Sequence, residues 1–298
     1  MANELPNNNK KGPDYTLLFF CVSRKLVKEV LQDWQQFLTY KPTKVTAAIE
    51  NSPDAIAFWD AIKADGLIDD YITIDLTKRS AREVCAEAIF ELVCKAETKW
   101  VMSINMDVLP FRVGNENWMA ETLDTMEKNN CIGFSGSFRS HLNERNADKT
   151  YSTRSFSANF GFIEKKVWET AVRDTISTID SLNHNKSASI LSQNRYVIES
   201  SIENYLFASG NRILFMEDSN EMSVFHTNFW EDDLAEIRER YHKRIGIRPY
   251  LNIGKKTLLP TWLIPPHKKY YGAKPTKNIC LRLKHFFWQA SRLVREAL

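Results

Sequence analysis

The sequence predicts an α/β fold built on a mainly parallel central sheet with helices on both of its faces. Short apolar segments alternate with segments of helical periodicity over the first 110 residues. This order of strands and helices is typical of parallel strands that are joined by crossover helices. The chain has 298 residues, of which 43% are hydrophobic, so it can bury a sizeable core.

The elements of the first half follow one another in order from residue 15. Strands are expected over residues 15–22, 44–49, 71–76 and 100–104, and helices over residues 26–38, 53–66 and 80–95. The second helix should begin at residues 51–53, because Pro fits the first turn of a helix. Gly66 should end that helix, and Ser80 can cap the third.

The pattern changes after Pro110. Helices are expected over residues 118–128, 195–207 and 232–244 and from residue 165 onward, and strands over residues 131–137, 157–163, 211–216 and 222–225. Residues 138–155 are polar, charged and without periodicity, so they predict a long loop. A loop of that length inside a compact domain is usually functional or disordered.

The charge of the chain is unevenly distributed. Residues 255–298 contain ten Lys and Arg residues and one acid, Glu296, whereas the preceding part is mildly acidic. We therefore predict a loose leader over residues 1–14, a domain over residues 15–250, and a basic aromatic tail over residues 251–298 that contains an amphipathic helix. Such a helix suits an anionic membrane surface.

The alternative for the tail is packing on its own domain or on a second copy of the chain. Nucleic acid is an unlikely partner, because the acidic body would oppose its binding. Five cysteines are scattered without a CxxC spacing, which is typical of reduced thiols in the cytoplasm. The longest apolar run, over residues 15–22, is too short to span a bilayer, so we expect a cytoplasmic protein that is peripheral on the inner membrane face.

Asn105 and Asp107 stand two positions apart at the end of the fourth predicted strand, in the segment W-V-M-S-I-N-M-D. In an open α/β sheet, ligands bind at the carboxyl ends of the strands. Two hard oxygen ligands at that edge suit a divalent cation, Mg²⁺ or Mn²⁺, that carries a diphosphate. The alternative is a strand that simply ends in a turn, because Asn and Asp are common turn residues.

A second group of polar residues lies between residues 198 and 226. The segment I-E-S-S-I-E-N-Y-L-F-A-S-G-N-R-I-L-F-M contains Glu199 and Glu203, and the later segment S-V-F-H ends at His226. With these motifs in this order, residues 15–230 resemble the glycosyltransferases of the GT-A fold. The Asp-x-Asp motif of that family corresponds here to Asn105-Met106-Asp107, so the first Asp is replaced by Asn.

The resemblance implies a division of the domain and a role for each motif. Residues 15–110 correspond to the nucleotide-sugar-binding half, and residues 111–250 correspond to the acceptor-binding half. Glu199 matches the catalytic base, with Glu203 as the second candidate. Asp107 and His226 match the metal ligands, with Asn105 beside them.

Further residues are candidates for contact with the nucleotide. The resemblance places the nucleotide base near Cys21 and Ser23, at the end of the first strand, and Glu50 at the end of the second strand is a similar candidate. Arg79 and Arg82 precede or begin the third helix, where they would contact the phosphates or simply face water.

We therefore expect a glycosyltransferase that moves a sugar from a nucleotide-diphosphate sugar to a hydroxyl of a cell-surface glycan or glycolipid. The reaction would be metal-assisted, and it would be inverting if Glu199 lies opposite the leaving group. One alternative is a nucleotidyltransferase, which usually carries a Gly-rich N-terminal loop that residues 20–24 lack. The other is a non-catalytic glycan- or membrane-binding module, which the Asn at position 105 favours.

Overall fold

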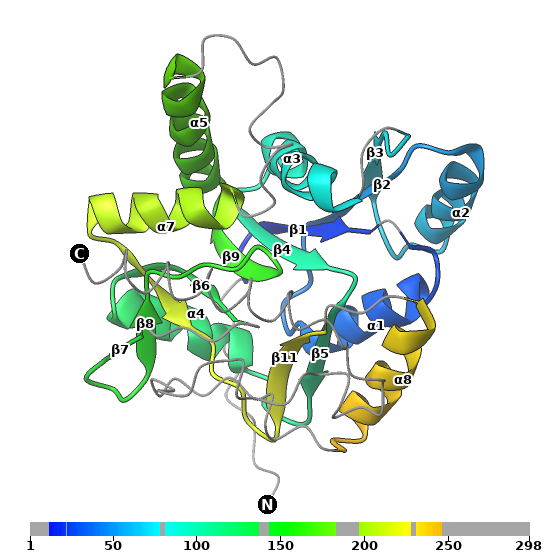
Figure 1. Ribbon diagram of the computed structural model, residues 1–298. Coiled ribbons are helices and arrows are strands. Elements are labelled where there is room, and N and C mark those ends of the chain that lie inside the picture. The colour runs from blue at the N-terminus through cyan, green and yellow to red at the C-terminus, as the bar shows by residue number, and fades with distance from the viewer. Residues whose placement is uncertain are drawn as a thin grey trace, which may run out of the picture.

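The computed structural model describes residues 12–21, 23–77, 81–136, 143–182, 197–227 and 231–245 (Figure 1). Its centre is a nine-stranded sheet in the order β3-β2-β1-β4-β9-β6-β10-β8-β7. The strands of this sheet are β1 (Tyr15–Phe20), β2 (Lys44–Glu50), β3 (Asp70–Ile74), β4 (Trp100–Asn105), β6 (Cys131–Ser135), β7 (Glu144–Arg145), β8 (Tyr151–Thr153), β9 (Phe160–Glu164) and β10 (Arg212–Phe215). The predicted α/β fold is confirmed.

The large sheet is mainly parallel. Its first four strands, β3, β2, β1 and β4, are parallel to one another, and β10 is parallel to β6. Within the described part of this sheet, only β9 and β8 run antiparallel to their neighbours. The carboxyl ends of β1, β2 and β4 therefore lie at one edge of the sheet, which is the edge where the motif at residues 105–107 was predicted.

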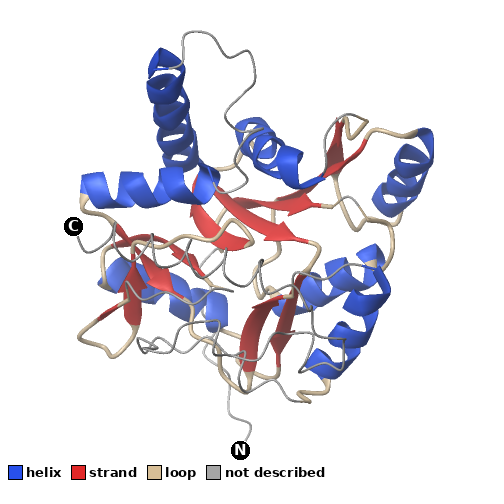
Figure 2. Ribbon diagram, in the orientation of Figure 1, coloured by secondary structure: helices blue, strands red, loops and turns tan. Residues whose placement is uncertain are grey.

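Helices cover both faces of the large sheet (Figure 2). One face carries α1 (Val27–Phe37), α2 (Pro53–Ala64), α4 (Trp118–Lys128) and α8 (Glu231–His242), and the other carries α3 (Ala81–Lys95), α5 (Lys165–Leu182) and α7 (Val197–Ser209). Leu17 and Phe19 of β1 belong to the first core, whereas Leu18 and Phe20 belong to the second. This alternation follows from the two-residue period of a strand.

A separate two-stranded sheet joins β5 (Val108–Arg112) to β11 (Met222–His226). The strand β5 was not predicted from the sequence. The two strands are antiparallel, and Val108 lies opposite His226. The buried Trp34 of α1 donates its indole N–H to the carbonyl of Val108 at 3.1 Å. The chain is thus held on both sides immediately after Asp107.

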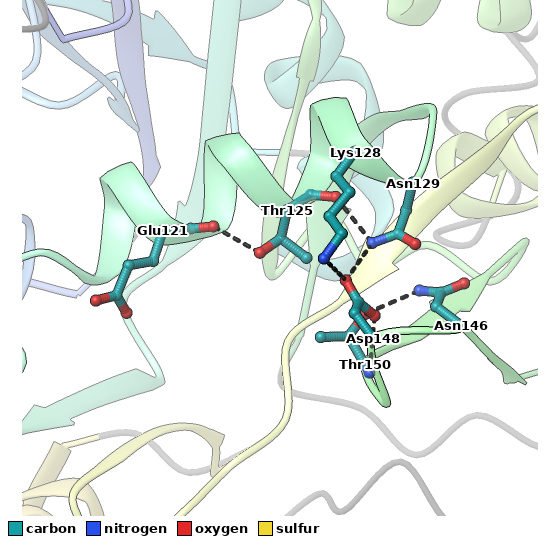
Figure 3. Close-up of polar contacts among 7 residues, drawn as sticks. All are labelled: Glu121, Thr125, Lys128, Asn129, Asn146, Asp148 and Thr150. Carbon is teal, nitrogen blue, oxygen red and sulfur yellow. Dashed lines mark hydrogen bonds and ion pairs between the residues drawn. The ribbon is translucent and has the colours of Figure 1, made fainter.

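The prediction of a long loop over residues 138–155 is wrong in part. β7 and β8 form a short antiparallel hairpin that pairs with β10. Asp148, in the turn of this hairpin, accepts hydrogen bonds from the Thr150 backbone and hydroxyl and from the Asn129 amide of the α4 C-cap (Figure 3). These two strands were not predicted because the hairpin is held by polar contacts, and its sequence has no alternation of apolar residues.

Asp148→Ala is expected to lower the free energy of unfolding by about 1 kcal/mol at neutral pH. Hydrogen bonds, above all from Thr150, hold the pKa of Asp148 below its ordinary value of 3.8. Because the pKa is lower in the folded state, this stabilisation is present above about pH 4 and is lost as the pH falls through the folded-state pKa. Urea unfolding of both proteins at about pH 7 and about pH 3 measures it, and an equal difference at both values would contradict it.

No helix of the described residues is long and apolar enough to cross a membrane. The predicted tail over residues 251–298, with its amphipathic helix, lies outside the described residues, as do residues 1–11 of the predicted leader.

Candidate functional site

The motif Asn105-Met106-Asp107 forms the end of β4 and the turn that follows it. Asn105 pairs with Phe20 of β1, and the Met106 N–H donates to the Phe20 carbonyl at 3.2 Å, so the parallel pairing extends into the turn. The Asp107 carbonyl accepts hydrogen bonds from the Thr227 N–H at 2.8 Å and from the Thr227 hydroxyl at 3.0 Å. The turn is therefore fixed through its backbone, and the side chains of Asn105 and Asp107 are not needed to hold it.

Asp107 and His226 face each other across the small sheet. The Asp107 Oδ2 and His226 Nε2 atoms are 3.2 Å apart, although the two residues are 119 positions apart in the sequence. The Asp107 side chain is buried and that of His226 is partly exposed. The antiparallel pairing of β5 with β11 causes this contact, because it places His226 beside Val108.

The chemistry of these side chains fits a divalent cation. Among the described residues, Asn105 Oδ1 and Asp107 Oδ1 are buried and have no hydrogen-bond partner, which is a costly state for a polar atom unless a ligand completes it. Atoms 3.2 Å apart, such as those of Asp107 and His226, can occupy neighbouring corners of an octahedron with bonds of about 2.1 Å, since such corners lie about 3 Å apart.

The described residues contain no group of three or more His, Cys, Asp and Glu side chains that could hold a metal ion. One carboxylate, one imidazole and one amide are nevertheless a suitable set for a cation that keeps several ligands from a bound diphosphate. Mg²⁺ and related ions are commonly held by one or two carboxylates together with substrate phosphates. A diphosphate bound beside this set would supply further oxygen ligands and tighten the binding of the cation.

Glu199 lies in the first turn of α7, on the opposite face of the large sheet from α1. Its Oε1 atom accepts a hydrogen bond from the Ala158 N–H at 3.4 Å. The pKa of Glu199 is raised from 4.5 to about 7, mainly by burial, with a smaller contribution from the charge of Glu203, whereas backbone N–H groups and His226 act in the opposite direction. Glu199 is linked to the motif at residues 105–107 through the chain, because Ala158, whose N–H it accepts, directly precedes Asn159, whose side chain accepts the Asn105 amide.

A carboxyl group with a pKa near neutrality is well suited to general-base catalysis. Glu203, one turn further along α7, accepts a hydrogen bond from the Phe156 N–H at 3.2 Å. The two carboxylates predicted from the sequence therefore both contact the segment that leads into β9. The structure thus brings Asp107 and His226 into direct contact, and it links Glu199 to Asn105 through residues 158 and 159.

The other predicted residues lie in different surroundings. Cys21 is fully buried and its thiol donates to the Ser23 carbonyl at 2.8 Å. Ser23 is buried, and its hydroxyl accepts from the Lys25 N–H at 3.3 Å. Glu50 ends β2 at the same edge of the sheet and is partly exposed. Arg79 lies outside the described residues, as does the side chain of Arg82, so the phosphate contact stays a prediction.

One polar residue of this site, Asn159, was not predicted from the sequence. The Asn105 amide donates from Nδ2 to Oδ1 of Asn159 at 2.5 Å. Asn159 directly precedes the apolar strand β9, and a polar residue at such a boundary is a weak signal, since turns commonly contain Asn.

No protein-family model and no curated protein sequence matches the chain. Among solved structures, it is similar to residues 1–349 of TarS from S. aureus, with 10% identity and a TM-score of 0.42, covering 78% of this chain and 65% of that one. It is also similar to the mannosyltransferase PcManGT from Pyrobaculum calidifontis, solved in complex with GDP-Man and Mn²⁺, with 12% identity and a TM-score of 0.38, covering 81% and 83%.

A third similar structure is a UDP-glucose pyrophosphorylase complexed with UDP-glucose, with 10% identity and a TM-score of 0.46, covering 78% of this chain and 99% of that one. The chain thus spans slightly less than two thirds of the TarS chain. Because all three TM-scores are below 0.5, these likenesses do not identify the function of this protein.

Proposed function

We propose that this protein is a glycosyltransferase of the GT-A type that transfers a sugar from a nucleotide-diphosphate sugar to a hydroxyl group. The acceptor in this proposal is a cell-surface glycan or glycolipid, and the divalent cation is Mn²⁺ or Mg²⁺. The observation that carries the proposal is the contact of Asp107 with His226 at 3.2 Å, beside a Glu199 whose pKa is about 7. The resemblance of the motifs assigns a metal site and a base to these residues.

The proposed metal ligands are Asp107 and His226, with the Asn105 amide oxygen beside them. When bound, the cation would act as a Lewis acid that neutralises the charge on the leaving diphosphate. Asp107 provides the only full negative charge of this set, and its turn is held by Thr227 and by the β5–β11 pairing. These contacts fix the carboxylate before any ligand arrives, which lowers the cost of ordering the site.

Glu199 is the proposed general base. The acceptor hydroxyl attacks the anomeric carbon, the bond from that carbon to the diphosphate oxygen breaks with its electron pair, and the hydroxyl proton passes to the Glu199 carboxylate. Since a base with a pKa near 7 is about half deprotonated at neutral pH, Glu199 can accept this proton without being too weak a base. Direct displacement of this kind inverts the anomeric centre.

Isothermal titration with a panel of nucleoside diphosphates, with and without Mn²⁺, tests the proposal. At least one nucleotide should bind, and Mn²⁺ should tighten its binding. Binding of no nucleotide would contradict an enzyme of this class. Product analysis then separates the alternatives, because a glycosyltransferase releases a nucleoside diphosphate and a nucleotidyltransferase releases pyrophosphate. Nucleotide binding without any turnover would favour a non-catalytic module.

The proposal also includes a cytoplasmic protein that is peripheral on the inner membrane face through residues 255–298. The basic and aromatic composition of that segment supports it, since each basic residue near anionic lipid contributes about 1 kcal/mol. The full chain should float with vesicles that contain anionic lipid, and a chain that ends at residue 254 should not. Undiminished flotation of the shorter chain would contradict the role of the tail.

A further inference from the structure

We propose that Asn159 is a positioning residue that holds the Asn105 amide with its oxygen available to the bound cation. The inference rests on the proposed function, because it concerns the same metal site. Asn159 accepts the Asn105 Nδ2–H at 2.5 Å, and Asn105 Oδ1 is left buried and without a partner among the described residues. This hydrogen bond fixes which end of the amide is free.

The orientation of the Asn105 amide decides what position 105 can bind. An amide has a donor end and an acceptor end, so the hydrogen bond made by one end determines what the other end offers. With Nδ2 engaged by Asn159, Asn105 offers an oxygen, which is a ligand for Mg²⁺ or Mn²⁺. The reverse orientation would direct an N–H dipole at the cation and repel it. A carboxylate at position 105 would offer oxygen at both ends and would need no such partner. Asn159 therefore allows an Asn at this position to act as an oxygen ligand.

Asn159 is itself held in a segment whose backbone is fixed by side chains. Four successive N–H groups, those of residues 156–159, each donate to a side-chain oxygen. The acceptors, in order, are Glu203, Ser135, Glu199 and the Ser157 hydroxyl. In addition, the Ser135 hydroxyl donates to the Phe160 carbonyl at 2.9 Å. A segment with this many side-chain acceptors has little freedom to shift Asn159.

The same segment connects the two halves of the proposed chemistry. Glu199, the proposed base, accepts from Ala158, which is the neighbour of Asn159 in the chain. The Glu199 carboxylate and the Asn105 amide are therefore both held by hydrogen bonds to the same short segment, residues 158 and 159. Removal of a residue that orients a metal ligand typically lowers the metal affinity by about 10- to 100-fold.

The test is a double-mutant cycle read out by Mn²⁺ binding, with the full chain and Mn²⁺ alone followed by electron paramagnetic resonance. Asn159→Ala should weaken Mn²⁺ binding by about 10-fold. Asn105→Ala should weaken it by a similar factor, and the double variant should be no weaker than Asn105→Ala, because Asn159 acts through Asn105. Asn159→Asp retains an acceptor oxygen for the Asn105 N–H, so it should restore most of the affinity.

A matched control separates positioning from general loss of structure. Asn129→Ala removes another side-chain amide hydrogen bond, the one to Asp148 at 2.8 Å, far along the chain from this site. It should reduce stability and leave Mn²⁺ binding unchanged. Asn159→Ala should also keep the acid limb of the pH–rate profile, because the hydrogen bond from Ala158 to Glu199 does not involve the Asn159 side chain.

Two results would overturn the inference. One is additive losses in the double variant, which would mean that Asn159 does not act through Asn105. The other is wild-type Mn²⁺ affinity in Asn159→Ala. The proposed function fails separately, if the wild-type protein binds Mn²⁺ but turns over no nucleotide sugar, since the binding cycle does not depend on turnover.

Discussion

Asp107→Ala is expected to reduce metal-dependent sugar transfer by about 1,000-fold or more while leaving the protein folded. Stabilisation of the leaving diphosphate by a cation contributes several kcal/mol to the rate, and each 1.4 kcal/mol corresponds to tenfold. Asp107 contributes the only full negative charge among the proposed ligands, so its loss should remove most of the Mn²⁺ affinity. Steady-state turnover and Mn²⁺ titration of the variant measure both effects.

The stability of the variant should not fall with its activity. The Asp107 side chain is buried, and its Oδ1 atom has no hydrogen-bond partner among the described residues. The Oδ2 atom contacts His226 Nε2 at 3.2 Å, so removing the side chain loses one polar contact but also relieves the burial of one unpartnered oxygen. The backbone contacts of Thr227 with the Asp107 carbonyl do not need the side chain. Because these two effects oppose each other, the melting temperature of the metal-free variant should stay close to that of the wild-type protein.

Asp69 offers a matched control for this experiment. Its carboxylate accepts the Val45 N–H at 2.7 Å before β3, which is a structural contact. Asp69→Ala should lower stability and keep Mn²⁺-dependent turnover, which is the opposite pattern. Retained activity in Asp107→Ala would show that Asn105-Met106-Asp107 is not the metal site, and the motif would then be an ordinary turn at a strand end.

Local sequence patterns were sufficient to predict the strands and helices of the first half of the chain. The alternation of apolar and helical segments identified β1 to β4 and their helices. The α2 helix begins at Pro53 as expected, and Ser52 caps it by accepting the Ala55 N–H at 3.3 Å. The antiparallel direction of β9 was not predicted, because direction depends on which neighbours a strand meets. β5 was missed because it is short, contains Pro110, and gains its partner only from β11.

The candidate site shows the same division between local and long-range information. Asn105 and Asp107 were predicted from their place at a strand end, and His226 and Glu199 from the order of motifs. Their contacts could not be derived, because the 3.2 Å distance between Asp107 and His226 depends on a strand pairing that closes over 119 positions. Asn159 was missed because its importance lies in one side-chain hydrogen bond, which no periodicity encodes.

Glu199→Gln is expected to reduce turnover by about 100- to 10,000-fold with little change in nucleotide affinity, since a general base acts on the acceptor and not on the nucleotide. The wild-type rate should fall as the pH drops below about 7, because protonation of Glu199 removes the base.

Glu203→Gln is the matched comparison on the same helix. It removes a negative charge that raises the pKa of Glu199, so its acid limb should move to lower pH with the plateau rate retained. A silent Glu199→Gln with an inactive Glu203→Gln would transfer the role of base to Glu203.

The same substitution should stabilise the protein in a pH-dependent way. The pKa of Glu199 is about 7 in the folded protein and 4.5 ordinarily, so the unfolded chain loses this proton first as the pH rises. The carboxyl group therefore begins to destabilise the fold above about pH 4.5, and the full cost is reached above about pH 7. Glutamine has no proton to lose, so Glu199→Gln should raise the free energy of unfolding at about pH 8 by more than at about pH 4. Urea unfolding of the metal-free proteins at both values measures this difference, and a difference that is independent of pH would mean that Glu199 ionises normally and is not poised as a base.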